Sequence, residues 1–582
     1  MILQALKEYY DRKAAVPESQ MAPDGFEWKE IQFVITLSKK GEPLNIENTI
    51  EGEGKARRSK LYLVPHSIVK SNNIAANCFW DNPEYTLGAN LENRAPKRVA
   101  ERHKAFVKRI EDLGDISDEG FKALKLFNSI PNKVAVLKEI AAKNPSMEKA
   151  LTELLETGRN VSFKLAGDTC LIVERKEIHN LMKTAPATSM QESGGICIVT
   201  GEKAKMSRLH TPIKGVWGAQ TRGANIVSFN LAAFNSYGKE QGANAPIGEP
   251  AAFAYATALN HLLGKDSKQR IQVGDASTVF WAEKATSLEK DFADFFNLPP
   301  KDDPDRGARA VESLLRSVDN GAFHSDEGKA RFYILGLAPN ASRLAVRFWI
   351  NNTVGGVSEK IARHFKDVEL VHGPKESGIL PIFRLLVSTA AAGKSENIPP
   401  NLAGETMRAI LEGLPYPRTL LQAAIRRIRA EHDITHPRAA LIKASINRFV
   451  RYQNLDNKED LKVSLDTTNT NNGYRLGRLF ATLEKIQSEA SLGLNATIRD
   501  KFYGAASSTP VTVFGNLMRL KNHHLSKLEH PGRKVFFEKL LSEIMDGVAA
   551  SGFPTHLALD DQGRFAIGYY HQTQVFYTKK AE

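Results

Sequence analysis

The stretch S-E-N-I-P-P-N-L-A-G at Ser395–Gly404 divides the sequence into two parts of different character. Its adjacent prolines and its terminal glycine interrupt regular structure. Before it, segments typical of strands alternate with helical ones, whereas after it almost every segment has the apolar spacing of a helix. We therefore predict an α+β fold, with a mixed N-terminal region of small antiparallel sheets over residues 1–400 and an all-α helical bundle over residues 401–582.

Beyond this boundary, two predicted helices carry many positive charges. Between Glu405 and Arg451 there are nine Arg or Lys residues and four Asp or Glu residues. The apolar residues repeat at helical spacing and most cations lie off that stripe. Such a surface can face nucleic acid, but an ordinary solvated helix surface has the same pattern, so both interpretations stay open. The cations concerned are Arg426, Arg427, Arg429, Lys443, Arg448 and Arg451.

Before the boundary, apolar spacing and turn residues predict a succession of short elements. They are strands at 31–37 and 61–64, a helix over 94–113, helices over 121–155 broken at Pro131 and Pro145, paired strands at 161–163 and 171–173, a helix at 250–264, a strand at 279–281 and a hairpin of 332–337 with 344–350 across Pro339-Asn340.

Glycines are dense between Gly194 and Gly248, and the centre of this region is K-G-V-W-G-A-Q-T-R-G at 214–223, which we call the Gly loop. Glycine lets backbone amides approach a phosphate closely, and Lys214 and Arg222 flank the loop. A groove or phosphate contact is one interpretation. A tight turn between strands is the other.

The segment K-S-N-N-I-A-A-N-C-F-W-D-N-P-E-Y-T-L-G at 70–88, the Asn-rich segment, combines four asparagines with three aromatic residues. Asparagine side chains carry a donor and an acceptor and can read base edges, while aromatic rings stack on bases. A basic cluster precedes it at Lys55, Arg57, Arg58 and Lys60. The plainer interpretation is that Trp80 and Tyr85 are core residues and that the asparagines form turns.

The composition narrows the class of protein. With 582 residues the chain is too long for one core, and its net charge of +13 favours a polyanionic partner. The three cysteines lie far apart with no CxxC pair, which argues against a zinc ribbon and fits a reducing cytoplasm. No apolar run approaches the roughly 18 residues of a membrane span, so no membrane association is expected.

A search for catalytic motifs gives one weak candidate. His432-Asp433 is similar to the pair in metal-dependent phosphohydrolases, but a second acidic partner with suitable spacing is missing. Asp433 also precedes Thr435 and Pro437, residues common at helix starts. We expect no enzymatic activity, no metal and no cofactor. The alternative is a metal-dependent nuclease that uses His432 and Asp433.

Several segments together resemble a known family, the large subunit of type I-C CRISPR Cascade complexes. The matching segments are M-I-L-Q-A-L-K-E-Y-Y at 1–10, A-P-D-G-F at 22–26, F-W-D-N-P-E-Y-T-L-G at 79–88, F-N-L-A-A-F-N-S-Y-G at 229–238, N-A-P-I at 244–247, F-W-A-E at 280–283 and G-Y-Y-H-Q at 568–572. They follow one another in order along nearly the whole chain.

This resemblance implies a non-catalytic subunit of a prokaryotic, cytoplasmic, RNA-guided antiviral complex. Its expected partners are the guide RNA with the backbone, handle-binding and small Cas subunits, the double-stranded target DNA and a recruited helicase–nuclease. The N-terminal region would recognise the protospacer-adjacent motif, hold the guide's handle end and dock on the backbone. The C-terminal bundle would resemble the small subunit, which in such systems is also made from an internal start; Met407 is early for one, and Val450 or Val463 could serve.

On this basis the residues receive roles. Lys70, Ser71, Asn72, Asn73 and Asn77 are predicted to read the DNA motif. The wedge at the first opened base pair is predicted in the Gly loop, at Gly218, Gln220, Thr221 and Gly223, with Gln220 beside the pair. Phosphate contacts are predicted for Lys55, Arg57, Arg58, Lys60, Lys214, Arg222, Arg426, Arg427, Arg429, Lys443, Arg448 and Arg451. A purely structural subunit that clamps the guide RNA is a further alternative.

Overall fold

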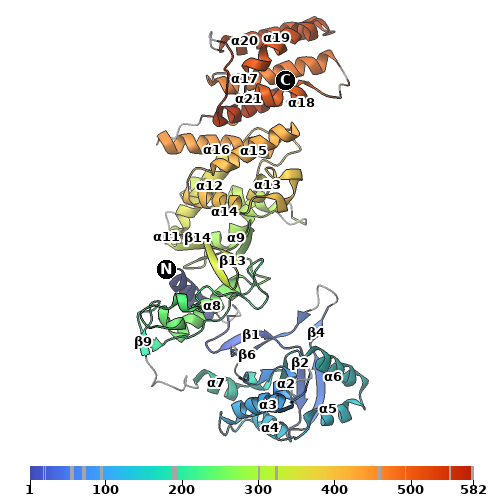
Figure 1. The fold of residues 1–582 in the computed structure, drawn as a ribbon, viewed down its shortest axis with the longest axis vertical. Helices are drawn as coiled ribbons and strands as arrows, with labels where there is room; N and C mark the ends of the chain where they lie inside the picture. The colour runs from blue at the N-terminus through green and yellow to red at the C-terminus, as the bar shows by residue number, and fades with distance from the viewer. Residues whose placement is uncertain are drawn as a thin grey trace. The chain divides into compact units, whose positions relative to one another are not determined.

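A computed structural model describes most of the chain, and its described residues form two compact units (Figure 1). The first unit comprises Met1–Ile213 and Val227–His261, and the second comprises Lys214–Ile226 and Leu262–Glu582. The described residues are 1–16, 19, 21–52, 58–68, 74–91, 96–184, 194–298, 302–303, 305–321, 326–454, 460–491, 493, 495–548 and 552–577.

The first unit is built on a four-stranded mixed sheet in the order β3-β2-β8-β7. Strands β2 and β8 are parallel and the other two pairings are antiparallel. The elements are α1 (Ile2–Ala14), β1 (Phe26–Glu30), β2 (Phe33–Leu37), β3 (Pro43–Asn48), β4 (Ile50–Glu51), β5 (Arg58–Ser59), β6 (Leu61–Pro65), β7 (Trp80–Asp81), α2 (Pro83–Thr86), α3 (Pro96–Glu111), α4 (Glu119–Asn128), α5 (Lys133–Ala141), α6 (Pro145–Thr157), β8 (Val161–Leu165), η3 (Ile172–Glu174), α7 (Lys176–Thr184), β9 (Gly194–Ile196), β10 (Lys203–Lys205), η4 (Ala232–Phe234), η5 (Gln241–Asn244) and α8 (Glu249–Leu262).

Local sequence explains most of these boundaries. The predicted breaks at the two prolines are confirmed, because Asn132 and Asn144 cap α5 and α6 by accepting hydrogen bonds from the first-turn amides. The predicted strand at 171–173 is wrong. These residues enter the 3-10 helix η3, since the Glu174 carboxylate accepts a hydrogen bond from the Leu171 N–H at 2.8 Å and closes a tight turn.

The second unit starts from an antiparallel sheet in the order β11-β12-β13-β14 and continues into helices. The predicted hairpin is confirmed, with the turn at Ala341-Ser342, just after Pro339-Asn340. The elements are β11 (Arg270–Val273), β12 (Ala276–Ala282), α9 (Ser287–Phe296), α10 (Arg306–Asp319), α11 (Asp326–Lys329), β13 (Arg331–Asn340), β14 (Arg343–Thr353), α12 (Val354–Val368), α13 (Ile382–Val387), η7 (Ala391–Gly393), η8 (Ser395–Asn397), α14 (Pro400–Glu412), α15 (Arg418–Glu431), α16 (His436–Asn454), α17 (Asn472–Ala490), α18 (Ile498–Ala506), α19 (Val511–Ser526), α20 (Pro531–Asp546) and α21 (Leu559–Tyr577).

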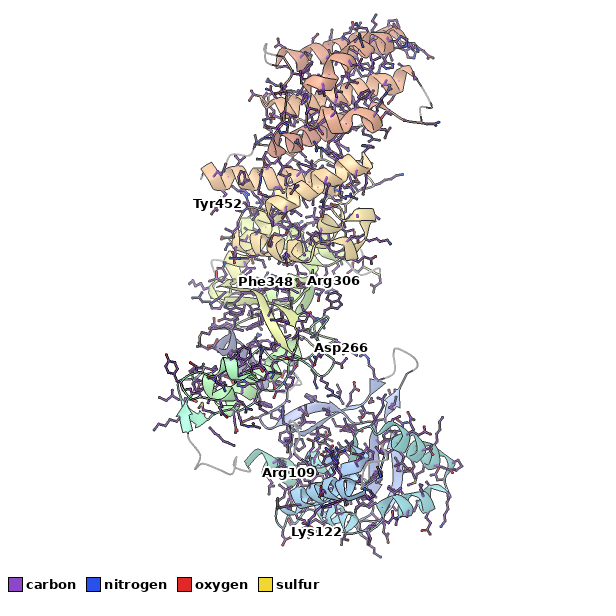
Figure 2. All side chains as sticks on the ribbon, in the orientation of Figure 1. Arg109, Lys122, Asp266, Arg306, Phe348 and Tyr452 are labelled. Carbon is purple, nitrogen blue, oxygen red and sulfur yellow. The ribbon has the colours of Figure 1, made fainter. Side chains whose placement is uncertain are left out.

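The α+β fold class is confirmed. All described strands lie before residue 354, and every secondary-structure element described from there on is a helix. One buried cluster runs from Ile271 in β11 to Tyr570 in α21 and includes Phe348 of β14 (Figure 2). Residues on both sides of the predicted boundary at residue 400 therefore share a core. None of the helices in the described part of the chain is long and apolar enough to cross a membrane.

Helices α17 and α21 approach each other at glycines. A Cβ atom at Gly568 would lie 2.0 Å from the backbone oxygen of Tyr474, and one at Gly477 would lie 2.0 Å from that of Phe565. Only glycine fits at such a separation, because any side chain would collide with backbone. The G-Y-Y-H-Q segment at 568–572 therefore begins with a packing requirement.

A buried ion cluster joins α12 to α16. The Asp367 carboxylate, 1% exposed, accepts hydrogen bonds from Arg448 at 2.9 Å and from Arg451 at 2.8 Å. The Arg448 guanidinium also donates to the carbonyls of Ala409 and Leu414, and the Lys443 ammonium donates to the Asp367 carbonyl at 3.2 Å. This single carboxylate thus offsets the two more buried guanidinium groups, and it also forms an ion pair with the 39%-exposed Arg363 at 3.5 Å.

We predict that Asp367→Asn lowers the free energy of unfolding by about 3–5 kcal/mol, because it leaves two guanidinium groups in the interior without their carboxylate. Urea unfolding of the full chain measures this. The matched control is Asp275→Asn, whose partner Arg347 is 43% exposed, and its cost should be no more than about 1 kcal/mol. Equal effects of the two substitutions would contradict the assignment.

Burial lowers the pKa of His571 in α21 to about 4, while Tyr474 hydroxyl bonds its Nδ1 at 2.9 Å. In the unfolded chain this pKa is about 6.5. The unfolded state then binds more protons between these values, so stability decreases as the pH falls from about 6.5 to about 4. We predict a shallower decrease for His571→Gln in urea titrations at several pH values. His556→Gln, at an exposed position, should keep the slope of the parent chain.

Candidate nucleic-acid interface

Asn77 links Ile68 to the described part of the Asn-rich segment, which begins at residue 74. Its Oδ1 accepts a hydrogen bond from the Ile68 N–H at 3.0 Å, and its own N–H donates to Asp81 Oδ2 at 2.9 Å. Asn77 is only 4% exposed, and this burial suits a structural role better than the predicted contact with DNA. The other motif-reading candidates, Lys70, Ser71, Asn72 and Asn73, lie outside the described residues.

The aromatic residues of this segment are core residues. Phe79, Trp80 and Tyr85 are between 1% and 4% exposed, and Trp80 Nε1 donates to the Pro65 carbonyl at 2.9 Å. The Asn82 side chain caps α2. The plainer interpretation of the sequence is therefore confirmed for these rings and for the turn-forming role of Asn82.

Two members of the basic cluster, Arg58 and Lys60, lie in or beside a short two-stranded ribbon. Strand β4 pairs with β5, and Arg58 stands opposite Glu51. Arg58 and Lys60 are exposed, with the Lys60 ammonium 5.1 Å from the centre of the Tyr62 ring. Lys55 and Arg57 lie outside the described residues.

The Gly loop consists of two consecutive turns on the second unit. The Ala219 N–H donates to the Val216 carbonyl at 3.1 Å, and the Gly223 N–H donates to the Gln220 carbonyl at 2.8 Å. Gly218, at the third position of the first turn, has a φ of +75°, which is the requirement of a type II turn. Both interpretations from the sequence are compatible with this geometry, since a tight turn can also present side chains to a ligand.

The loop is anchored at both ends and its polar side chains are outside. The Trp217 N–H donates to Ser277 Oγ in β12 at 2.9 Å, and Asn225 pairs with Arg343 of β14. The four predicted polar or charged contact residues of the loop are all exposed; they are Lys214, Gln220, Thr221 and Arg222. The Gly loop, residues 214–223, contains no acidic residue.

Sequence reasoning missed Trp217, which is 62% exposed and stands among these residues. An exposed indole beside cations is the combination that stacks on bases. The available signal was its position between two glycines, outside any apolar periodicity.

The predicted C-terminal cations separate into two groups. Arg426 is exposed, Arg427 forms an ion pair with Glu431 at 3.2 Å, and Arg429 is partly buried. Lys443, Arg448 and Arg451 belong to the cluster around Asp367. Lys443 and Arg451 are eight residues apart and so lie on one face of α16, but that face is turned into the protein and does not offer these groups to phosphates.

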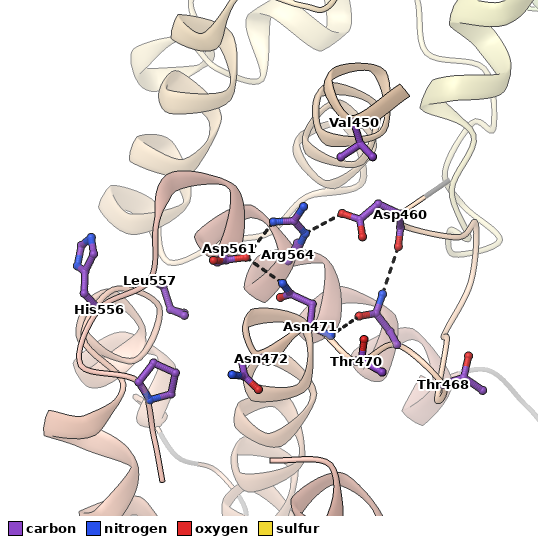
Figure 3. A pocket seen from close by; sticks show the side chains of 12 residues that line it. Val450, Asp460, Thr468, Thr470, Asn471, Asn472, His556, Leu557, Asp561 and Arg564 are labelled. Carbon is purple, nitrogen blue, oxygen red and sulfur yellow. Dashed lines mark hydrogen bonds and ion pairs between the residues drawn. The ribbon is translucent and has the colours of Figure 1, made fainter. Parts of the chain in front are cut away.

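A hollow of about 890 Å³ in the second unit lies between the 468–472 loop and the start of α21 (Figure 3). At its wall the Arg564 guanidinium binds Asp460 at 2.7 Å and Asp561 at 2.8 Å, and Asn471 also donates to Asp561. Two carboxylates against one guanidinium do not favour an anionic ligand.

The two residues of the nuclease alternative, His432 and Asp433, directly follow α15. His432 ends α15 in a left-handed conformation with φ of +53°, and the Asp433 carbonyl accepts a hydrogen bond from Arg438. Within the described residues, no group of three or more His, Cys, Asp or Glu side chains could hold a metal ion.

Comparison with known families now adds to this geometry. The profile of the CRISPR-associated protein family Cas_Csd1 matches residues 6–577. The chain belongs to the CRISPR-associated Cas_Csd1 family. No curated protein matches the chain.

Membership of the Csd1 family confirms the resemblance seen in the sequence, to the large subunit of a type I-C Cascade complex. Several of the segments that carried this resemblance are packing motifs in the structure. The 79–88 segment forms β7 and α2, and F-W-A-E at 280–283 includes the buried end of β12.

We predict that Asn77→Ala removes the protection of the Ile68 amide, because the acceptor for its N–H is lost. Hydrogen–deuterium exchange of the full chain, read in peptides that contain Ile68, measures this. Asn45→Ala, at an exposed position of β3, should leave those peptides unchanged. Unchanged protection in Asn77→Ala would show that this bond does not hold the Ile68 amide.

Proposed function

We propose that this member of the Csd1 family is the non-catalytic large subunit of an RNA-guided type I-C interference complex, which recognises a short motif in duplex DNA and starts strand separation. The family match over residues 6–577 supports a CRISPR-associated Cascade subunit. The observation that carries the DNA contact is the Gly loop, where exposed Lys214 and Arg222 flank an exposed indole with no acidic residue between them.

The division of labour follows from what each partner can read. A guide RNA reads most of the target by base pairing, so the protein needs only a short duplex signal. In this proposal Lys70, Ser71, Asn72 and Asn73 approach that signal, and Asn77 holds Ile68, which precedes them in the sequence. If the minor groove is used, the discrimination is mostly between A·T and G·C pairs.

The Gly loop provides the separating element in this proposal. Gln220 lies beside the first opened base pair, and Lys214 and Arg222 contact the flanking phosphates. Opening a step costs a few kcal/mol, which a rigid loop anchored at Trp217 and Asn225 can offset without ordering itself first. Arg58, Lys60 and Arg426 are the other exposed cations proposed to contact the backbone of the nucleic acid.

Cutting belongs to a different protein in this proposal. The subunit binds target DNA, the guide RNA and the backbone, handle-binding and small Cas subunits, and it supports recruitment of a helicase–nuclease. It carries out no chemistry of its own.

For Lys214→Glu/Arg222→Glu in the assembled complex, we predict weaker binding of motif-bearing duplex and a less steep salt dependence. Each phosphate contact contributes about 0.9 to the slope of log K against log salt, so loss of two contacts should lower it by about 1.8. Filter binding between 50 and 200 mM salt measures the slope. The matched control is Lys284→Glu/Lys290→Glu, two exposed lysines of the same unit, and an equal reduction there would point to net charge alone.

For Asn72→Ala/Asn73→Ala, we predict a loss of discrimination between motif-bearing and scrambled duplex, with binding to scrambled duplex retained. Loss of direct base contacts costs about 1–3 kcal/mol each. R-loop yield, read by permanganate reactivity of the displaced strand, provides the measurement. If the parent complex opens both duplexes equally, the subunit is a guide-RNA clamp and the proposal is wrong.

A further inference from the structure

The loop between Asn230 and Glu240 is an exposed element with three large apolar side chains, and the proposed DNA recognition gives it no role. All eleven of its residues are exposed, among them Leu231 at 55%, Phe234 at 36% and Tyr237 at 97%. These three side chains follow one another at intervals of three residues. Three large apolar side chains exposed within one short loop are candidates for a contact with another molecule.

The backbone of this loop is fixed by its own hydrogen bonds. The Asn244 side chain accepts from the Ser236 N–H at 3.0 Å and donates to the carbonyls of Lys239 and Gln241 at 3.1 and 3.0 Å. The Lys239 N–H donates to the Ser236 carbonyl at 2.9 Å and closes a four-residue turn. The loop is therefore preformed, and a partner would not have to order it.

The residue at the tip of this turn is strained. Tyr237 and Gly238 have φ values of +52° and +68°, the combination of a type I′ turn, in which Asn, Asp or Gly normally occupies the first position. The left-handed backbone of Tyr237 costs conformational free energy. Tyr237 is 97% exposed, so burial of its ring within the chain offsets almost none of this cost. We expect a contact of the Tyr237 ring with another molecule to offset this conformational cost.

The charge of the loop decides between the classes of partner. Residues 227–246 contain one lysine and one glutamate, and Arg208 at its base is bonded to Gln241 at 2.8 Å. Loops that hold single strands combine aromatic rings with excess positive charge, as the Gly loop does. A neutral loop with apolar anchors is instead typical of the buried centre of a protein–protein interface.

We infer that the 230–240 loop docks on another protein subunit of the assembled complex, with the Tyr237 ring inserted into an apolar pocket of that subunit. The inference rests on the proposed membership of a multi-protein complex, but not on recognition of a DNA motif. Leu231 and Phe234 flank the ring and exclude water from the contact.

The test combines assembly with stability. Tyr237→Gly removes the ring and also relieves the positive φ, so the isolated chain should have an equal or higher melting temperature. When it competes with the parent chain for the other subunits, we expect at least tenfold lower incorporation into the complex. Tyr237→Phe should assemble normally. Tyr452→Ala, which removes another exposed tyrosine, is the control and should incorporate like the parent chain.

A photo-crosslinker, p-benzoylphenylalanine, at position 237 identifies the partner in the same complex. A crosslink to a different protein subunit supports the inference. A crosslink to RNA, to DNA, to the same chain or to a second copy of it would overturn the inference, as would normal incorporation of Tyr237→Gly. Because this readout needs no DNA motif, its failure is separate from failure of the proposed function.

Discussion

The charge balance at Asp367 is the constraint on which the second unit depends. One carboxylate, almost fully buried, is shared by Arg448 and Arg451, and Arg448 also binds the carbonyls that end α14. A guanidinium in this place would be very costly without its acid, so α12, α14 and α16 can pack only in the arrangement that brings these groups together. The strand-containing and helical parts of the unit are joined through this contact as well as through apolar surface.

Much of the fold could be predicted because local sequence determines it. The prolines and the capping asparagines fixed the breaks between α4, α5 and α6. The helix predicted over 94–113 is α3, and its buried residues Val99, Phe106 and Ile110 repeat at helical spacing. The strand predicted at 171–173 failed because of a local turn closed by Glu174, whereas the exposed cationic face expected on α16 failed because of a distant partner. The Lys443–Arg451 face of α16 has helical spacing in the sequence, but only the fold shows that Asp367, 76 or more residues earlier, turns that face inward.

The candidate site was predictable to a smaller extent. The Gly loop could be located from its composition. The position of Trp217, however, is held by a hydrogen bond from its N–H to Ser277 Oγ, sixty residues away in sequence, which the sequence does not show. In the Asn-rich segment, Asn77 and Asn82 form hydrogen bonds that fix the backbone. Residue type alone does not distinguish these asparagines from asparagines that would face a ligand. The family match supplies the biological setting that side-chain chemistry leaves open.

The glycine contact between α17 and α21 has a consequence for any shorter polypeptide translated from within the same reading frame. Both halves of that contact lie after Val463, so a product starting there would retain its closest helix pairing. It would lack α16, whose Ile442 and Ile446 lie against Gly563, and also Val371, whose carbonyl accepts the Tyr570 hydroxyl. Such a fragment would expose an apolar stripe along α21, and its solubility would depend on another protein segment that covers this stripe.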